Sequence, residues 1–285
     1  MIHIMYNPLA NGKKDSLDAV MEKFKFITDT KEFHDVRTIP ETNEFLKPLP
    51  KDDVVVFCGG DGSLNHLANE IDISKVEQRL FYFPNGTGND FYTDVKDSAK
   101  IENGMIYIND YLKNLPTVTV NGMTKKFING IGFGIDGYCC EEGDKQRANS
   151  DKPVNYTAIA IKGLLFKFKP RTATVTVDGV TKEFKNCWLA PTMFGRYYGG
   201  GMQIAPNQDR TSSQRTITTV AWYCPNKFRM LACFPSVFKG EHTKYTKLLT
   251  FMTGKEVKVE FSTPCALQID GETVLNVKSY TVKID

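Results

Sequence analysis

The chain has 285 residues, of which 41% are hydrophobic and 24% are charged, a composition typical of a folded globular protein and not of a disordered or fibrous one. At about 150 residues per domain, this length predicts two domains, each able to bury its own core. No apolar stretch approaches the ~20 residues of a membrane span, and the first residues do not resemble a secretory signal, so we expect a cytoplasmic protein. Seven cysteines without a C-x-x-C pair favour reduced thiols over a disulfide framework or a zinc site.

Charge is divided unevenly along the chain. Residues 1–112 hold 12 Lys and Arg against 19 Asp and Glu, a net charge of −7, whereas residues 113–285 hold 24 against 14, a net charge of +10. This asymmetry predicts two domains with different partners, with a boundary near Leu112 to Pro116. The basic half could face nucleic acid, a phosphorylated substrate or an anionic membrane surface, and charge alone does not decide among them.

The first half alternates between strand-like and helix-like segments, which predicts an open, parallel α/β sheet. The expected elements are a strand at 3–6, a helix at 16–26, a buried strand at 53–57, a helix at 64–71 and a strand at 80–83. In the first helix, Leu17, Val20, Met21 and Phe24 share one face. Ligands of such sheets bind at the carboxyl ends of the strands.

The second half alternates apolar and polar residues in short runs separated by turn signals, which predicts an antiparallel β-sandwich. The expected strands lie at 117–120, 172–177, 216–222, 256–261 and 280–284. Two helices are expected at 154–166 and 226–238.

Three glycine-rich loops follow strands of the first half directly. They span Asn7–Lys14, Cys58–Ser63 and Pro84–Phe91. Glycine lets the backbone approach a ligand closely, and the amides at the start of a helix bind phosphate. Because a carboxylate such as Asp61 repels phosphate unless a divalent cation lies between them, the pattern favours a Mg²⁺-nucleotide, and the alternative is that Asp61 caps the helix. Three such loops on successive strand ends predict a polyphosphate site.

Several catalytic motifs are absent from the sequence. It contains no P-loop, no protein-kinase motif set and no nucleophile elbow. The stretch Gly132–Gly137 matches the dinucleotide fingerprint by letter, but no acidic residue follows about 20 positions later and the flanks are not a βαβ unit, so we do not expect it to bind a dinucleotide. The four histidines show no metal-ligand spacing and are expected to be surface or core residues.

The motifs of the chain are, in order, NPLANGKK, GGDGSLNHLANE, PNGTGNDF, FINGIGFGIDG, APNQDR, FKGEHTKY and LQIDGE. Over almost the whole chain they resemble the diacylglycerol kinase catalytic family, which includes bacterial diacylglycerol kinases, YegS-type lipid kinases, and sphingosine and ceramide kinases. The resemblance implies an NAD kinase-like α/β nucleotide-binding domain at residues 1–112, followed by an antiparallel β-sandwich lipid-binding domain at residues 113–285. This agrees with the pattern of elements.

The resemblance also implies an activity. It is that of an ATP- and Mg²⁺-dependent lipid kinase that phosphorylates a lipid hydroxyl, with diacylglycerol as the first expected acceptor and phosphatidic acid as its product. The alternatives are a sphingoid-base or ceramide kinase, a soluble NAD kinase-like small-molecule kinase, and a non-catalytic lipid- or nucleotide-sensing protein.

Site residues follow where the sequence matches the motifs of the family. The resemblance implies that ATP is held by Asn7, Gly12, Lys13, Gly59, Gly60, Gly62, Ser63, Asn65 and Thr87. It implies an acidic set, Asp61, Asp90 and Asp110, that organises Mg²⁺ through water. Glu272 matches the residue usually assigned as the general base, with Asp61 as its competitor for that role.

Two departures from the family pattern change these expectations. Ser63 and His66 stand where many relatives have Thr and Glu, so no role is expected for an acid at position 66. The stretch Thr211–Thr216 has no carboxylate, so we do not expect the second, structural metal site of some bacterial members.

Two basic stretches in the second half, 162–171 and 227–239, interleave cations with large apolar residues. They predict transient docking on an anionic membrane surface, and the alternative is a pair of core helices with solvated lysines. We expect no nucleic-acid partner. The sequence does not decide the oligomeric state, and a homodimer stays open.

Overall fold

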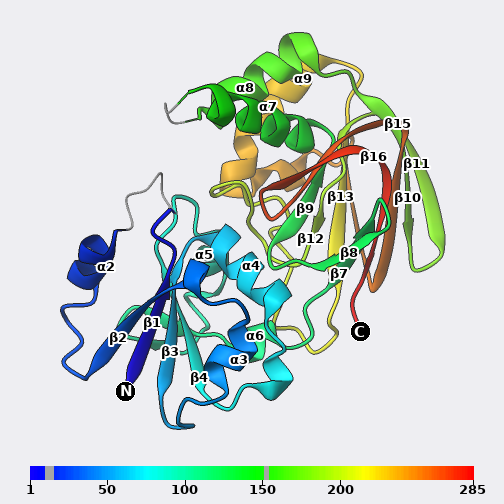
Figure 1. The fold of residues 1–285 in the computed structure, drawn as a ribbon. Helices are drawn as coiled ribbons and strands as arrows, with labels where there is room; N and C mark the ends of the chain where they lie inside the picture. The colour runs from blue at the N-terminus through cyan, green and yellow to red at the C-terminus, as the bar shows by residue number, and fades with distance from the viewer. Residues whose placement is uncertain (10–15, 151–153) are drawn as a thin grey trace. The chain divides into compact units, whose positions relative to one another are not determined.

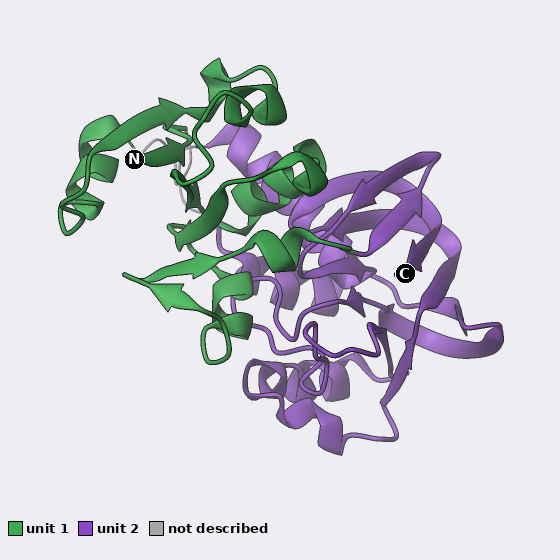
Figure 2. Ribbon diagram, turned by 90° about the horizontal axis from the view of Figure 1, so that it is seen from below, with its two compact units in different colours: residues 1–115 green, residues 116–285 purple. Residues whose placement is uncertain are grey.

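The computed structural model describes residues 1–9, 16–150 and 154–285. The chain divides into two compact units, Met1–Leu115 and Pro116–Asp285 (Figure 2). This division falls inside the stretch in which the sequence placed the boundary.

Unit 1 is an α/β domain. Its elements are β1 (Ile2–Tyr6), α2 (Leu17–Lys23), β2 (Lys31–Asp35), η1 (Val36–Thr38), α3 (Thr42–Leu46), β3 (Val54–Gly59), α4 (Asp61–Glu70), η2 (Ile73–Lys75), β4 (Arg79–Pro84), α5 (Asp90–Val95), β5 (Ile101–Glu102), β6 (Met105–Tyr107) and α6 (Asn109–Leu112). The strand order in the sheet is β2-β1-β3-β4-β6-β5 (Figure 1). The first four strands are parallel, whereas β6 runs antiparallel to β4 and to β5, so the sheet is mixed at one edge.

The strand order contains a topological switch point. Strand β1 pairs with β2 on one side and with β3 on the other, so the connections from β1 and β3 leave in opposite directions. In open α/β sheets the ligand crevice lies at the carboxyl ends of the strands at such a point. The loops after Tyr6 and Gly59 are therefore the ones that the topology brings to a site.

Helix α2 covers one face of this sheet. It is capped by the Ser16 side chain, and Val20 and Phe24 are buried against Ile4 and Val56 of the sheet. The other two apolar residues of the expected face, Leu17 and Met21, are 43% and 45% exposed, because the helix ends at Lys23 and presents only one narrow stripe to the sheet.

Unit 2 is built mainly of antiparallel strands. Its elements are β7 (Thr117–Val120), β8 (Met123–Lys126), β9 (Gly130–Phe133), α7 (Ile135–Asn149), α8 (Tyr156–Lys162), the π-helix η3 (Gly163–Lys167), β10 (Arg171–Val177), β11 (Val180–Leu189), β12 (Thr192–Met193), β13 (Ile217–Tyr223), α9 (Lys227–Cys233), η4 (Phe234–Lys239), η5 (Glu241–Lys244), β14 (Leu249–Gly254), β15 (Glu256–Ile269) and β16 (Glu272–Lys283). The sandwich expected from the sequence is present, and it is partly closed. Strand β10 pairs with β11 and also with β15, so that the path β10-β11-β13-β12-β9-β15 returns to its start.

The helices of unit 2 gather at one end of its sheets (Figure 1). Helix α7 packs on β15 and β9, α8 and η3 pack on α7 and on each other, and α9 packs on η3. Beneath them lies a core that includes Leu164, Trp188, Trp222 and Met230. The helices expected at 154–166 and 226–238 are each broken into two pieces, α8 with η3 and α9 with η4, since Gly163 and Pro235 interrupt the α-helical bonding.

Candidate active site

A cavity of about 520 Å³ lies beside the carboxyl ends of β1 and β3, wholly within unit 1. Four residues expected to bind nucleotide line it: Asn7, Gly59, Gly62 and Ser63. The other lining residues are Met5, Val36, Arg37, Ile39, Thr42, Phe57, Cys58, Leu64, His66, Leu67, Glu70 and Tyr82. The cavity therefore lies where the topology of the sheet predicts a ligand site.

The loop after β3 leads directly into α4. The helix begins at Asp61, three residues earlier than expected from the sequence, with Gly60 as its N-cap and no side-chain cap. Asp61 therefore does not cap α4. Because the first-turn amides of a helix have no intrahelical acceptor, this N-terminus offers backbone donors and a positive dipole end to an anion.

Close packing requires the glycines of this loop. A Cβ on Gly59 would lie 2.6 Å from the Cβ of Ser63, and a Cβ on Gly60 would lie 3.0 Å from the Cα of Gly86. At Gly62, by contrast, a Cβ would meet nothing within 4 Å, so the space above this residue is open on the cavity side.

The loop after β4 is locked onto the loop after β3. The Asn85 amide donates to Gly59 O at 2.8 Å. Asn89, in the left-handed region at φ 51°, closes its own loop, because its Oδ1 accepts from the Gly86 amide at 2.9 Å and its Nδ2 donates to Gly86 O at 2.8 Å. The two glycine loops form one rigid edge.

Asp61 joins the two loops through its carboxylate. Its Oδ2 accepts from the Asp90 amide and its Oδ1 from the Phe91 amide, both at 2.9 Å. These amides belong to the first turn of α5, so Asp61 caps the neighbouring helix instead of its own. Asp90 itself is 5% exposed, and its carboxyl lies close enough to contribute, with that of Asp61, to the electrostatic environment of Tyr82.

Tyr82 brings a polar group into the cavity wall. Its hydroxyl is buried and, within the described part of the chain, has no hydrogen-bond partner. Burial and then the Asp61 charge raise the pKa of this phenol well above its usual value, so it remains a donor. An orphaned buried hydroxyl costs about 1–3 kcal/mol.

The structure does not bring Asp110, the third member of the expected acidic set, to this edge. Strand β6 runs antiparallel to β4, and the Asn109 side chain that follows it bonds the backbone of Leu80 and Gln78, where β4 begins. Asp110 therefore lies at the amino end of the sheet, away from the loops of Asp61 and Asp90. It is 71% exposed and ion-paired to Lys113 Nζ at 2.8 Å.

The remaining expected nucleotide residues lie in different places. Gly12 and Lys13 fall outside the described residues. Thr87 is exposed in the loop after β4, and Asn65 is buried on α4 at 3% exposure, where its backbone oxygen accepts from Asn69 Nδ2 at 3.0 Å.

Sequence reasoning missed Arg37, the cation of the cavity wall. It follows β2, a strand that was not expected because KEFHD lacks an apolar alternation. Its guanidinium holds the Asp35 carboxylate through two bonds from Nε, at 3.0 and 3.1 Å, and one from Nη2. To place Arg37 at the cavity from sequence, one would first have had to predict strand β2, which ends just before it.

In unit 2, Glu272 opens β16 after a tight turn. Asp270 and Gly271 have φ values of 44° and 93°, which identifies the two-residue hairpin between β15 and β16. Glu272 is half-exposed and ion-paired to Lys125 Nζ at 2.9 Å. Asp270, two residues earlier, has a structural role instead. Its carboxylate accepts hydrogen bonds from the backbone amides of Ile128, Asn129 and Gly130 at 2.5–2.9 Å.

Comparisons with known proteins place both units in one family. Residues 1–120 match the model of the diacylglycerol kinase catalytic domain, and residues 129–283 match the model of the YegS C-terminal NAD kinase beta sandwich-like domain. The chain belongs to the diacylglycerol kinase family. Membership of this family identifies the chain as a kinase.

Named relatives in this family are distant in sequence. The diacylglycerol kinase of Mycobacterium tuberculosis is 25% identical over 213 residues, which cover 73% of this chain and 67% of the relative. The putative lipid kinase YtlR of Bacillus subtilis is 25% identical over 235 residues, 76% of this chain and 73% of the relative. The solved structure of a putative diacylglycerol kinase from Bacillus anthracis matches all of this chain and 93% of its own with a TM-score of 0.65 at 14% identity, which shows the common fold.

Proposed function

We propose that this lipid kinase transfers the γ-phosphoryl group of ATP to the hydroxyl of a lipid alcohol, with diacylglycerol as the acceptor and phosphatidic acid as the product. The observation that carries the proposal is the pair of interlocked glycine loops at the edge of the 520 Å³ cavity. Phosphoryl transfer asks mainly for positioning and charge neutralisation, and rigid backbone amides at a helix N-terminus supply both.

The residues of unit 1 fit a bound nucleotide. The open space at Gly62 admits phosphate against the first turn of α4. We propose that Asp61 and Asp90, without Asp110, hold Mg²⁺ through water. When bound, this ion would neutralise the phosphate oxygens. Asp61 fits an indirect role, since both of its oxygens already accept backbone amides and it is held in one orientation.

We assign the role of general base to Glu272 in preference to Asp61. A base needs a carboxylate oxygen that can reach the acceptor hydroxyl, directly or through one water. Glu272 is half-exposed, is held at the start of β16 by the hairpin turn, and is ion-paired to Lys125 Nζ at 2.9 Å. Asp61 is less accessible to an acceptor hydroxyl, because both of its oxygens already accept amides of α5.

The lipid is assigned to unit 2, which contains its own cavity of about 590 Å³ between η3 and the start of α9. Apolar side chains such as Leu164, Phe168 and Trp188 line this cavity. Phe166 and Phe228, which also line it, are 77% and 65% exposed. Large exposed aromatics beside an apolar cavity are unusual on a protein that faces only water, and they fit contact with lipid.

Charge around this cavity favours an anionic bilayer as the surface from which the lipid is taken. Residues 154–171 and 225–239 together carry seven Lys and Arg and no Asp or Glu. Lys227 Nζ donates to Leu165 O at 2.9 Å and lies 5.9 and 5.5 Å from the ring centroids of Phe166 and Phe228. Within the described chain no helix has the length and apolar character needed to cross a membrane. We therefore propose peripheral docking.

The test is transfer of labelled phosphate from ATP to a panel of lipid alcohols in mixed micelles, with and without Mg²⁺. We expect phosphatidic acid from diacylglycerol and no product when the divalent ion is chelated. Product from a sphingoid base or ceramide alone would show that this lipid, and not diacylglycerol, is the acceptor, and the protein would still be a lipid kinase. Product from NAD alone, or no transfer to any acceptor, would contradict the proposal.

A further inference from the structure

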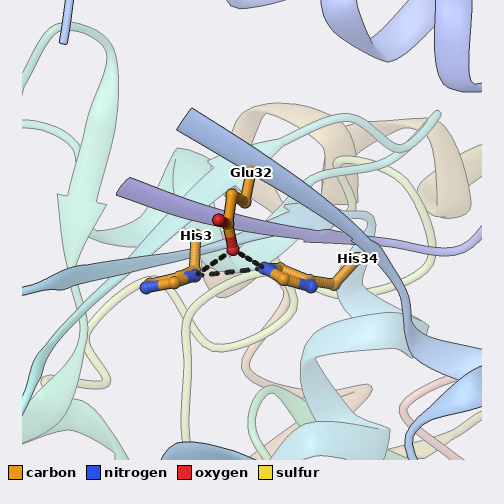
Figure 3. A group of neighbouring side chains, drawn as sticks. All are labelled: His3, Glu32 and His34. Carbon is orange, nitrogen blue, oxygen red and sulfur yellow. Dashed lines mark hydrogen bonds and ion pairs between the residues drawn. The ribbon is translucent and has the colours of Figure 1, made fainter. Parts of the chain in front are cut away.

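Three side chains from two neighbouring strands converge on one point in unit 1 (Figure 3). His3 Nδ1 lies 3.1 Å from His34 Nε2, and Glu32 Oε2 lies 3.6 Å from the first nitrogen and 3.8 Å from the second. Among residues 1–9, 16–150 and 154–285 this is the one group of three such side chains with ligand atoms this close together. None of the three belongs to the kinase site described above.

The parallel pairing of β1 and β2 explains why these residues meet. His3 pairs with Glu32, and His34 pairs with Met5, two residues further along. Residues two apart on a strand share a face, so His3, Glu32 and His34 project from the same side of the sheet. The 30 residues between the two histidines hide this proximity from a search for metal-ligand spacing.

Asp53 fixes the tautomer of His3. Its Nε2 lies 3.0 Å from Asp53 Oδ2, and both side chains are buried. An ionised carboxylate only accepts hydrogen bonds, so Nε2 carries the proton and Nδ1 directs a lone pair at His34 and Glu32. A carboxylate behind a histidine is the arrangement that orients imidazole ligands in metal sites.

His34 is held in position by packing. Its ring lies edge-to-face against Phe45 of α3, with the ring centroids 4.9 Å apart.

We propose that His3 Nδ1, His34 Nε2 and the Glu32 carboxylate form a binding site for one divalent transition-metal ion of the zinc class. With metal–ligand distances of about 2.0–2.1 Å, tetrahedral ligands lie about 3.3–3.4 Å apart, and the observed separations of 3.1, 3.6 and 3.8 Å bracket that value. The ion would replace the proton shared by the two imidazole nitrogens. Since Glu32 is 53% exposed, water can take the fourth position.

This site is chemically distinct from the proposed Mg²⁺ site. Two imidazoles and one carboxylate suit zinc-class ions, whereas Mg²⁺ prefers oxygen ligands alone. It also adjoins the nucleotide cavity: Met5, which pairs with His34, lines that cavity, and so does Thr42 of α3, the helix whose Phe45 packs on His34. Metal bound here would tie β1, β2 and α3 together along one wall of the cavity.

The experiment measures Zn²⁺ and Co²⁺ binding to the full chain after metals have been removed with a chelator. Calorimetry should give one equivalent of Zn²⁺, and Zn²⁺ should raise the melting temperature, because it binds only the folded state. Bound Co²⁺ should show the visible absorption of a four-coordinate site without a thiolate charge-transfer band, which separates this site from the seven cysteines. Millimolar Mg²⁺ should not compete.

Three variants locate the ion. His34→Gln and Glu32→Gln should weaken binding by more than about 100-fold, since loss of an outer-shell partner alone costs about 10–100-fold. His66→Gln is the matched control, because His66 is an exposed histidine paired with one carboxylate, Glu70, at 3.0 Å, without a third ligand. It should bind Zn²⁺ like the wild type.

The half-exposed Glu32 can be replaced without disturbing the core, so the proposal stays testable even if the histidine variant is unstable. Wild-type protein that binds no Zn²⁺, or a Glu32→Gln variant that binds it with unchanged affinity and an unchanged Co²⁺ spectrum, would show that the three side chains form only a hydrogen-bonded cluster.

Discussion

Asp61 has a structural task that the sequence did not reveal. From sequence alone, replacing it by Asn should leave stability nearly unchanged, because an amide can still cap a helix. In the structure both of its oxygens accept amides of α5. An Asn side chain has one oxygen, and its NH₂ group would face an N–H donor.

For Asp61→Asn we therefore expect two losses. Phosphoryl transfer at saturating Mg²⁺ should fall below detection if Asp61 organises the ion. Unit 1 should lose about 1–3 kcal/mol of stability through the missing charge-assisted hydrogen bond. Turnover and denaturant unfolding measure the two effects, and normal turnover combined with lower stability would leave Asp61 with the capping role alone.

Asp110→Asn tests whether Asp61 and Asp90 hold Mg²⁺ without Asp110. Asp110 is highly exposed at the amino end of the sheet, and its partner is the surface residue Lys113. Exposed pairs of this kind contribute about 0–1 kcal/mol. We expect turnover and stability close to those of the wild type. Complete loss of Mg²⁺-dependent activity in this variant would show that Asp110 also helps to hold the ion.

Tyr82→Phe separates binding from folding. Since the buried hydroxyl has no partner among the described residues, its removal should leave the ligand-free protein equally stable or slightly more stable. Because Tyr82 is fully buried, its hydroxyl does not face a ligand in the cavity, and the KM for ATP should stay close to that of the wild type. A KM that rises several-fold without a fall in melting temperature would show that the hydroxyl reaches bound nucleotide.

Glu272→Gln tests the general base. The substitution keeps the size of the side chain and removes its ability to take a proton, so kcat should fall by about 10²–10⁴ with the KM for ATP nearly unchanged. Lys125→Met is the control for the ion pair: it removes the partner of Glu272 but leaves the carboxylate in place, and should change kcat much less. A Glu272→Gln enzyme within a few-fold of wild-type kcat would transfer the role to Asp61.

At the scale of elements, the sequence predicted those strands whose pattern is local. Val54–Gly59 is apolar throughout and Thr117–Val120 alternates cleanly, and both are strands close to the expected bounds. The partners of these strands were not predictable, because pairing across many residues leaves no local pattern. The closure of unit 2 by β10 and β15 and the length of β15, which continues past a bulge to Ile269, depend on such pairing.

The stretch Gly132–Gly137 shows how a glycine pattern can serve packing alone. The strand that contains Gly132, β9, pairs antiparallel with both β12 and β15, so the βαβ context of a dinucleotide site is absent, as expected. A Cβ on Gly134 would collide with the backbone of Trp188, and one on Gly137 with that of Ala266. The glycines let α7 start directly against the sheet, which the letters alone could not show.

Asp136, next to these glycines, ties the stability of unit 2 to pH. Its carboxyl is buried and accepts a hydrogen bond from the Tyr198 hydroxyl, and burial raises its pKa to about 6. Between pH 3.8 and 6 the unfolded chain releases a proton that the folded chain keeps, so this group lowers stability as pH rises. It has no further effect above pH 6.

A shift of roughly two pKa units corresponds to about 3 kcal/mol. Asp136→Asn removes the titration and keeps an acceptor for Tyr198. The stability of the variant relative to the wild type should therefore increase by up to about 3 kcal/mol between pH 4 and pH 7. Both tryptophans, Trp188 and Trp222, lie in unit 2, so fluorescence unfolding reports this unit. A difference that does not vary with pH would show that Asp136 keeps an ordinary pKa.

For the molecule as a whole, the asymmetry of charge becomes a prediction about where it works. The basic half forms unit 2, and its acid-free stretches 154–171 and 225–239 carry the exposed Phe166 and Phe228. Each cation near an anionic surface contributes about 1 kcal/mol, and each buried aromatic about 1.5–3 kcal/mol, so the sum is enough for reversible docking. On a neutral membrane only the contribution of the aromatic side chains to the binding free energy would remain.

We therefore expect the protein to sediment with vesicles that contain phosphatidylglycerol and to remain in solution with phosphatidylcholine vesicles at low salt. Salt at about 0.5 M should release it, because screening shortens the reach of the lysines. Phe166→Ala with Phe228→Ala should weaken binding, whereas Leu275→Ala, which removes a 58% exposed side chain of β16 outside this surface, should not. Equal sedimentation with neutral and anionic vesicles, or a double variant that binds like the wild type, would mean that these phenylalanines and lysines do not form the docking surface.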